Sequence, residues 1–296
     1  MRITEFLTQF RCSPRTRETY AKYLQFFADY LRGEGIDIAD ATPAHFEAMA
    51  NARGWHANSA RLGLAATKAY VRHFHGSAHP LVAYRIKRAP SPIMRAMTPE
   101  NVRKLLAVCD SNTRAGAQYV VIILVLYDTW MRASELCRLR VEDLDIPNRK
   151  LKVLTKGSEW EPKVFSDMTA AYLEAWLIER RGIARPDCPS VFCNVLRGTQ
   201  LTRDGLRGNF NRLGAKAGIK VSPHDFRRGG PSQAARRGIP DRLGMLQGGW
   251  KDHRQYQRYT ESLTVDDLRP YFPTNELGVP LERYPQAEDY RDAHSS

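Results

Sequence analysis

A basic, proline-rich segment divides this 296-residue chain into two parts. The segment reads Lys87-Arg88-Ala89-Pro90-Ser91-Pro92. Proline lacks a backbone N–H, and a residue that precedes proline avoids the helical region, so a helix cannot run through this segment. Proline-rich sequence of this kind favours an extended linker. The chain is long enough for the part on either side to bury a core of its own, which predicts two domains.

The part before the linker carries helical patterns. Ser13-Pro14 is typical of a helix N-cap and first helical residue, and apolar residues then recur at intervals of three and four. Thr42-Pro43 predicts the start of a second helix and Asn58-Ser59 the start of a third. We therefore expect a small all-α bundle over residues 1–86 and a linker over residues 87–97. We expect no additional domain before Ser13.

The part after the linker is predicted to be helical with one β-hairpin. Thr98-Pro99 begins a helix, and the apolar run from Tyr119 to Tyr127 indicates a buried helix too short to cross a membrane. Residues 151–154 and 160–165 have the character of strands on either side of a turn. Further helices are expected at about residues 169–181 and 203–217. Residues 98–273 then form a second domain, and residues 274–296 form an acidic C-terminal tail.

The most evident chemistry lies between His224 and Tyr259. Ser222-Pro223 predicts a helix that places His224 and Arg227 on one face of its first turns. An imidazole transfers protons and a guanidinium binds anions bidentately, a combination that suits phosphate chemistry. Trp250 offers an indole N–H downstream, and Tyr259 offers a hydroxyl.

The charge of the chain predicts a polyanionic partner. Its 45 Lys and Arg against 32 Asp and Glu give a net charge of +13 and a pI of about 9.7, which favours nucleic acid over a membrane surface. The five cysteines lack the spacing of a zinc site and are expected to be reduced thiols in a cytoplasmic protein. No phosphate-binding loop, dinucleotide fingerprint or metal-spaced carboxylate cluster occurs, so we expect neither cofactor nor metal.

The order and spacing of His224, Arg227, Trp250 and Tyr259 resemble the second conserved box of the tyrosine recombinases, the phage integrase family. Trp250 stands where most members have a second histidine, which resembles the Cre branch. Tyr256 is an alternative nucleophile because it lies three residues before Tyr259. Tyr259 is favoured because the interval of nine residues from Trp250 is similar to that in Cre and Xer recombinases.

The segment Thr129-Trp130-Met131-Arg132-Ala133-Ser134-Glu135-Leu136 is similar to the first box of that family, usually Thr-Gly-x-Arg-x-x-Glu-Leu. The resemblance aligns Arg132 with the first arginine of the family and Glu135 with its acidic partner. Trp130 departs from the pattern because it replaces the glycine. If this position requires a left-handed backbone, tryptophan is strained there.

The hairpin resembles the one whose tip carries a catalytic lysine in this family. Lys156, in the turn Thr155-Lys156-Gly157-Ser158, is the candidate. Lys152 and Lys163 lie on the strands and are expected to be solvated or to contact the backbone.

In the helix that begins near Ser222, Pro231 removes one hydrogen bond and predicts a bend, either a kink or a restart.

The resemblance implies a mainly α fold, with a helical N-terminal core-binding domain and an α-rich catalytic domain with a small antiparallel β-hairpin sheet. It implies a site-specific recombinase that cuts and rejoins double-stranded DNA at short inverted-repeat sites, through a 3′-phosphotyrosyl intermediate and as a homotetramer. The implied catalytic residues are Arg132, Glu135, Lys156, His224, Arg227, Trp250 and Tyr259. Two alternatives stay open: a type IB topoisomerase with the same chemistry, and a DNA-binding relative without catalytic activity.

Basic residues outside the two boxes are candidates for contacts with the DNA backbone or, before the His224 helix, with the major groove. A solvated surface is the alternative for each of them. The candidates are Arg61, Lys68, Arg72, Lys87, Arg88, Arg203, Arg207 and Arg212.

Overall fold

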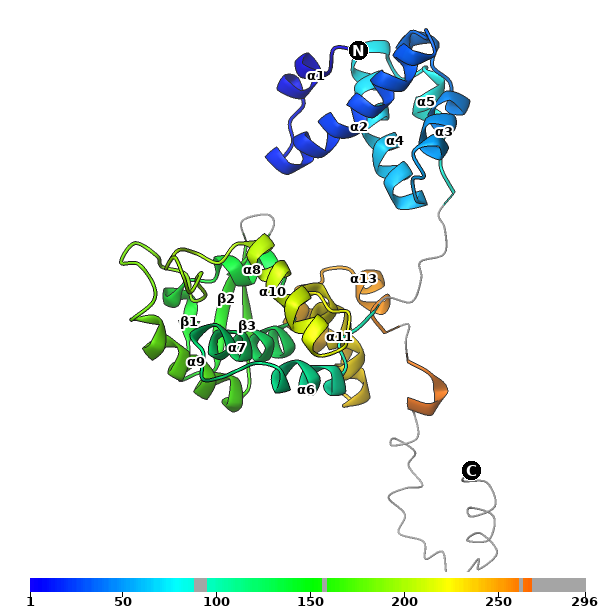
Figure 1. The fold of residues 1–296 in the computed structure, drawn as a ribbon. Helices are drawn as coiled ribbons and strands as arrows, with labels where there is room; N and C mark the ends of the chain where they lie inside the picture. The colour runs from blue at the N-terminus through cyan, green and yellow to red at the C-terminus, as the bar shows by residue number, and fades with distance from the viewer. Residues whose placement is uncertain (88–94, 156–158, 261–262, 268–296) are drawn as a thin grey trace, which may run out of the picture. The chain divides into compact units, whose positions relative to one another are not determined.

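The computed structural model describes residues 1–87, 95–155, 159–260 and 263–267, and the chain divides into two compact units, Met1–Pro92 and Ile93–Ser296 (Figure 1). Three of the predictions therefore lie outside the described residues: Arg88 with most of the linker, Lys156, and the C-terminal tail over residues 274–296.

The first unit is a helical bundle in which α2 and α4 pack together with shorter helices against them. Its core includes Leu24, Phe27, Phe46 and Leu64. The helix start at Ser13 is confirmed, because the Ser13 hydroxyl accepts the third amide N–H of α2. The elements are α1 (Ile3–Gln9), α2 (Pro14–Gly33), η1 (Ile38–Asp40), α3 (Pro43–Ala52), α4 (Ala57–His75) and α5 (Pro80–Ala83).

Two details of this unit differ from the sequence-based expectations. The helix α1 was not predicted, although its Phe6 is completely buried in the bundle core. The helix α4 begins after His56, so Asn58 and Ser59 lie in its first turn and do not cap it. Helix boundaries of this kind depend on packing as well as on local capping preferences.

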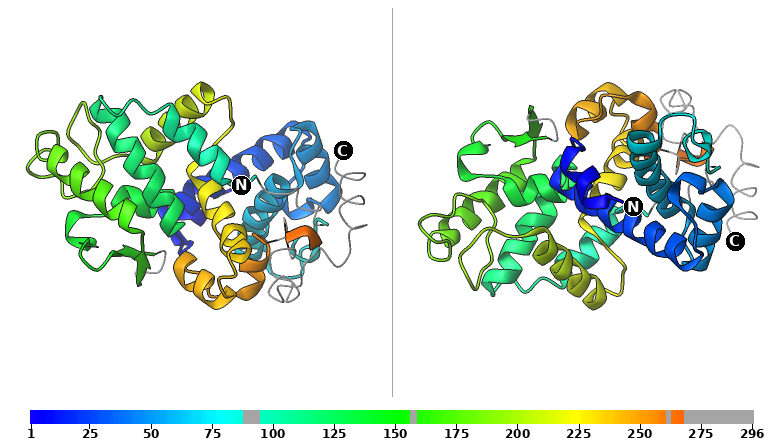
Figure 2. Two further views of the ribbon diagram at one scale, coloured as in Figure 1. Left: turned by 90° about the horizontal axis from the view of Figure 1, so that it is seen from below. Right: turned by 90° about the horizontal axis from the view of Figure 1, so that it is seen from above.

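The second unit is built around α7 (Arg114–Thr129), whose Ile122, Ile123, Val125 and Leu126 are buried. This helix packs against α6, α9, α11 and the strand β3 (Figures 1 and 2). Such an apolar helix is stable in water only when other elements cover it on all sides. The other helices are α6 (Pro99–Ala107), α8 (Ala133–Arg138), η2 (Val141–Asp143), α9 (Asp167–Arg180), α10 (Arg203–Lys216), α11 (Pro223–Arg236), α12 (Asp241–Gly248) and α13 (His253–Gln257).

A small antiparallel sheet completes this unit. Its order is β1 (Leu144–Asp145), β2 (Lys150–Leu154) and β3 (Trp160–Val164), and the β2–β3 pair confirms the predicted hairpin. In the register, Leu151 is opposite Lys163 and Val153 is opposite Glu161. Since Leu151 and Val153 are buried, Lys163 and Glu161 belong to the core-facing side of the sheet. The mainly α fold class with a small antiparallel sheet is thus confirmed.

The helix α11 runs without interruption from Pro223 to Arg236, so the chain does not restart its helix at Pro231. Across the described ranges, no helix combines the length and the apolar character that crossing a membrane requires.

Candidate active site

The turn after α7 has the left-handed backbone that its alignment with a glycine suggested. Trp130 is the C-cap of α7 with φ 52° and ψ 23°. A left-handed conformation costs a residue with a Cβ about 1–2 kcal/mol. The turn joins α7 to α8 and places Arg132 at the N-cap of α8.

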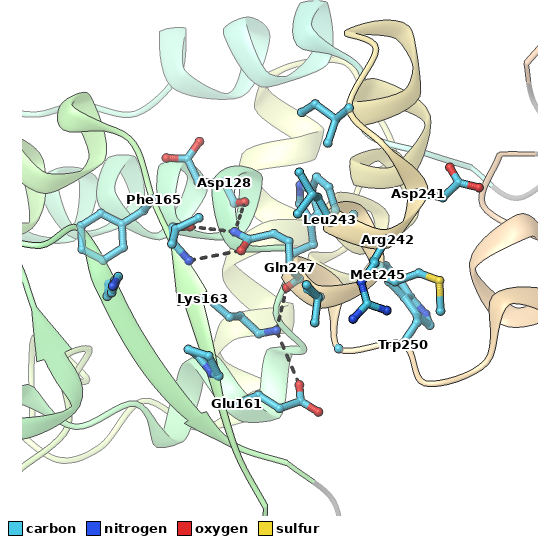
Figure 3. Close-up of a pocket in the computed structure, with 18 of the residues that line it drawn as sticks. Asp128, Glu161, Lys163, Phe165, Asp241, Arg242, Leu243, Met245, Gln247 and Trp250 are labelled. Carbon is cyan, nitrogen blue, oxygen red and sulfur yellow. Dashed lines mark hydrogen bonds and ion pairs between the residues drawn. The ribbon is translucent and has the colours of Figure 1, made fainter.

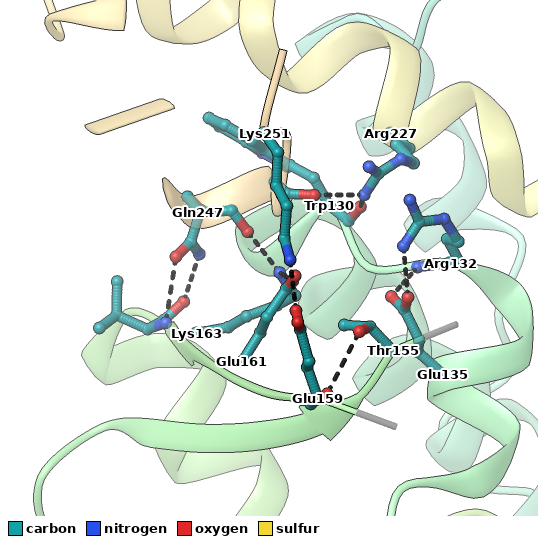
Figure 4. Close-up of polar contacts among 12 residues, drawn as sticks. Trp130, Arg132, Glu135, Thr155, Glu159, Glu161, Lys163, Arg227, Gln247 and Lys251 are labelled. Carbon is teal, nitrogen blue, oxygen red and sulfur yellow. Dashed lines mark hydrogen bonds and ion pairs between the residues drawn. The ribbon is translucent and has the colours of Figure 1, made fainter. Parts of the chain in front are cut away.

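Arg132 is held by Glu135 from within the same short segment. The buried Glu135 carboxylate accepts the Arg132 backbone N–H at 2.7 Å and its Nη1–H at 2.6 Å (Figure 4). The Arg132 side chain keeps 42% of its surface exposed, whereas that of Glu135 keeps 2%. One carboxylate thus fixes a guanidinium whose outer side faces solvent.

Arg227 lies in the second turn of α11 and is almost completely buried, with 2% of its surface exposed. Its Nη1 donates to the carbonyl oxygens of Trp130 at 3.0 Å and Gly248 at 2.6 Å, and its guanidinium carbon lies 4.2 Å from the centre of the Trp250 ring. Among the described residues, its buried Nη2 has no hydrogen-bond partner. A buried cationic nitrogen without an acceptor is suited to receiving an anion.

Burial, and then the charge of Arg132, lower the pKa of Arg227 to about 10. The guanidinium therefore keeps its charge at neutral pH. Arg132 and Glu135 of the first box act on this pKa, as does Tyr259 of the second, so the two boxes meet at Arg227.

His224 lies one turn before Arg227 and is itself exposed, between the buried Pro223 and Asp225 of α11. Desolvation of its ring and the charges of Arg228 and Arg227 lower its pKa below the ordinary value of 6.5. The imidazole is therefore mostly neutral at pH 7 and able to accept a proton.

Trp250 contacts both candidate tyrosines. Its ring centroid lies 5.1 Å from that of Tyr259 and 5.4 Å from that of Tyr256. Tyr256 is completely buried on α13, its hydroxyl has no partner among the described residues, and burial raises its pKa to about 12. Tyr259 is partly exposed in the turn after α13, where its carbonyl accepts the Ser232 hydroxyl at 2.5 Å. The two side chains therefore differ in access to solvent, which favours Tyr259 as the nucleophile.

The two strand lysines behave differently. Lys152 is exposed, with its Nζ 5.0 Å from the Trp160 ring centroid. Of the two alternatives expected for Lys163, solvation is wrong, because only 1% of this side chain is exposed and its Nζ donates to the backbone carbonyl of Gln247 at 2.7 Å. Its Nζ also lies 3.7 Å from the Glu161 carboxylate, and burial lowers its pKa. Lys163 thus attaches the hairpin strand β3 to α12.

Gln247 strengthens the same attachment with its side chain. Its amide nitrogen donates to the carbonyls of Val164 at 2.7 Å and Asp128 at 2.9 Å, and its amide oxygen accepts the Val164 N–H at 3.2 Å (Figure 3). Three elements, β3, α12 and the end of α7, therefore meet at one side chain. Sequence reasoning did not select Gln247, and its position directly before Gly248-Gly249-Trp250 was the available signal.

Asp225 is a further residue that sequence reasoning missed. Its carboxylate is buried and accepts the Ser222 N–H at 2.7 Å and the Arg95 Nε–H at 2.9 Å, and Arg228 also pairs with it. It fixes the start of the helix that carries His224. The Ser-x-x-Asp spacing of a capping box could have identified it.

A groove of about 1190 Å³ lies between β3 and α12 (Figure 3). Trp130, Lys163 and Trp250 contribute to its lining, whereas Arg132, His224, Arg227 and Tyr259 do not. The anion-binding groups are thus outside this groove. In the described part of the chain, no three His, Cys, Asp or Glu side chains gather closely enough to hold a metal ion.

The basic residues outside the boxes are mostly at the surface. Arg61, Arg72 and Lys87 are exposed, as are Arg203, Arg207 and Arg212 on α10. Lys68 is half-buried and donates to the Tyr84 carbonyl, so part of its hydrogen-bonding capacity is used within the bundle.

Two arginines, an imidazole and a partly exposed tyrosine are carried by one helical unit, a set of groups suited to the class of enzymes that attack a phosphodiester with tyrosine. The model of the phage integrase family matches residues 95–265, more than half of the chain, and the chain belongs to this family.

Relatives and solved structures agree with this assignment. The chain is 28% identical to the tyrosine recombinase XerA of Pyrococcus furiosus over 81% of this chain and 82% of that protein. It is 27% identical to the tyrosine recombinase XerD of Pseudomonas aeruginosa over 83% and 86%. The Tn1549 transposon integrase, in complex with transposon right end DNA, shares the fold with a TM-score of 0.73 at 16% identity, over 96% and 99% of the two chains. The resemblance to the Cre branch stays a prediction.

Proposed function

We propose that this protein is a site-specific tyrosine recombinase that cuts and rejoins duplex DNA through a 3′-phosphotyrosyl intermediate. One observation carries the proposal: the buried Arg227 has a nitrogen without an acceptor, and it stacks on Trp250, which contacts Tyr259. An anion-binding group and a nucleophile are thereby joined through one aromatic ring.

In the proposed reaction, the Tyr259 oxygen attacks the scissile phosphorus. The bond from phosphorus to the tyrosine oxygen forms, and the bond from phosphorus to the 5′-oxygen breaks. Tyrosine has a pKa near 10 and needs a base at neutral pH, which is the role of the neutral imidazole of His224. Lys156 supplies a proton to the departing 5′-oxygen. The reverse reaction, with the 5′-hydroxyl of another strand, rejoins the DNA without ATP.

The charge that grows on the non-bridging oxygens is met by two arginines. Arg132 presents an exposed guanidinium that Glu135 orients, and Arg227 presents its unsatisfied Nη2. Fixed cations of this kind stabilise a transition state more than water does, because they do not reorganise during the reaction. Trp250 donates an indole N–H or packs against the nucleophile, and it cannot act as a base.

The proposed partner is double-stranded DNA that carries short inverted repeats, bound by four copies of the chain. Solved structures with the same fold include XerH bound to a palindromic substrate and a lambda integrase dimer bound to a core site. The helical unit over residues 1–86 and the catalytic unit over residues 98–273 clamp the duplex in this proposal. The exposed arginines of α4 and α10 supply contacts with the phosphate backbone.

The relatives support recombination over the two alternatives. XerA and XerD, quoted above, are named tyrosine recombinases and match more than four fifths of this chain. A relative without catalytic activity would have lost part of the constellation, and all seven predicted positions keep their residues.

The test is covalent capture on a nicked duplex, from which the strand with the departing 5′-hydroxyl is lost after cleavage. Wild-type protein is expected to form an adduct that survives denaturation. Tyr259→Phe is expected to bind the DNA and form none, since it lacks only the nucleophilic oxygen. Tyr256→Phe is the matched control and is expected to form the adduct, because it removes a buried hydroxyl that has no partner. Adduct formation by Tyr259→Phe, or its absence in a folded Tyr256→Phe, would contradict the assignment.

A further inference from the structure

Trp130 occupies a position that its residue type does not favour. Its left-handed backbone, with φ 52°, is a conformation that glycine adopts without strain. Strain of this kind persists only where the surrounding structure enforces it, and it occurs most often near functional sites. The indole is almost completely buried, with 8% exposure. The contacts around this ring therefore hold the strained turn in place.

The space for the indole comes from a glycine on another helix. A Cβ added to Gly230 of α11 would lie 2.3–2.4 Å from three atoms of the Trp130 ring system, so the ring would have to shift to make room for it. The large residue at position 130 and the small residue at position 230 are thus complementary in size. The centroid of the Trp130 ring also lies 6.5 Å from that of the Trp250 ring.

A second indole lies against a second glycine in the same cluster. A Cβ on Gly248 would lie 1.7 Å from the Trp250 ring. The carbonyls of Trp130 and Gly248 are the two acceptors that hold Nη1 of Arg227. One acceptor thus belongs to Trp130, which packs against Gly230, and the other belongs to Gly248, which packs against Trp250.

We propose that Trp130, packed into the space left by Gly230, positions Arg227 for the scissile phosphate. Trp130 is a positioning residue in this proposal, since it acts through its carbonyl and its ring and does not itself touch the DNA. The proposal rests on the proposed function, because it assumes that Arg227 binds a non-bridging oxygen. When the indole is absent, the carbonyl of residue 130 is free to move, and the guanidinium loses one of its two fixed acceptors.

Changing the charge of the DNA linkage distinguishes a variant that misplaces Arg227 from a variant that only destabilises the fold. A phosphodiester has a negatively charged non-bridging oxygen that a guanidinium stabilises. A methylphosphonate carries a methyl group in place of that oxygen and is neutral, so its cleavage depends less on Arg227. A variant that only loosens the fold would slow the cleavage of both linkages equally.

The experiment measures the first-order rate of adduct formation at saturating DNA, with each linkage at the scissile position. Trp130→Gly suits the left-handed backbone and removes the side chain with its ring. We expect it to lower the phosphodiester rate about 100-fold, the loss typical of a misplaced catalytic group, with a much smaller loss on methylphosphonate. Trp130→Phe keeps a ring and is expected to recover most of the rate.

Trp176→Phe is the matched control, because Trp176 is another buried indole, in the core on α9. It is expected to lower the unfolding temperature and to leave the ratio of the two rates unchanged. If Trp130→Gly does not fold, Gly230→Ala decides, since it displaces the same ring while residue 130 stays intact.

Equal losses on the two linkages, or no loss on the phosphodiester, would overturn the proposal for Trp130 and leave the proposed function standing. Failure of the wild-type protein to form an adduct with the phosphodiester would overturn both.

Discussion

Gln247→Glu tests whether one side chain attaches the hairpin to the rest of the catalytic unit. The substitution keeps the shape of the side chain and the oxygen that accepts the Val164 N–H. It replaces the amide nitrogen, which donates to the carbonyls of Val164 at 2.7 Å and Asp128 at 2.9 Å, by a second carboxylate oxygen. Two hydrogen bonds are lost without a change in volume.

The magnitude follows from those two bonds. A neutral hydrogen bond contributes about 1 kcal/mol net to the free energy of unfolding, so the loss is about 2 kcal/mol. Repulsion between the carboxylate and the two carbonyls adds to this loss, and attraction to the ammonium of Lys163, which binds the Gln247 carbonyl, offsets part of it. In a domain of this size about 2 kcal/mol lowers the unfolding temperature by about 4–8 °C.

The assay is thermal unfolding of the full chain at pH 7, followed by circular dichroism and fitted with separate transitions for the two compact units. Gln257→Glu, at an exposed position of α13, makes the same change of charge and is expected to leave the unfolding temperature unchanged. If Gln247→Glu unfolds at the same temperature as its control, the attachment inferred between β3, α12 and α7 is not a stabilising one.

Two further predictions concern the lysines of the hairpin. Lys156→Ala is expected to bind DNA almost normally and to cleave it slowly, and a sulfur at the bridging 5′ position should restore the cleavage rate, since a thiolate leaves without a proton. Intact binding with no restoration would remove Lys156 as the acid. Burial lowers the pKa of Lys163 in the folded protein below 10.5. Between that lowered pKa and 10.5, Lys163 is still protonated in the unfolded state but has lost its proton in the folded state. The wild-type protein should therefore gain stability relative to Lys163→Met as pH rises through that window, measured as the difference between their denaturant midpoints, and a constant difference would contradict it.

The sequence by itself determined the features that depend on neighbouring residues. Helix starts at Ser13 and Thr98 were predictable because each hydroxyl accepts an N–H three residues later in the chain. The order and spacing of the two boxes also identified the family, and the glycine in the usual pattern suggested the left-handed turn at Trp130. These features require only local hydrogen bonds or a linear pattern.

The tertiary structure alone decided which side chains are buried together. Lys163 appeared to be an ordinary strand lysine, and its burial depends on a carbonyl 84 residues further along the chain. The contact between Trp130 and Gly230 joins two helices, and neither residue indicates the other in the sequence. Tyr256 and Tyr259 could have faced the same side of one helix, but α13 ends between them, so one hydroxyl is buried and the other side chain is partly exposed. Local patterns fix where helices begin, whereas the environment of a side chain depends on distant segments that only folding brings together.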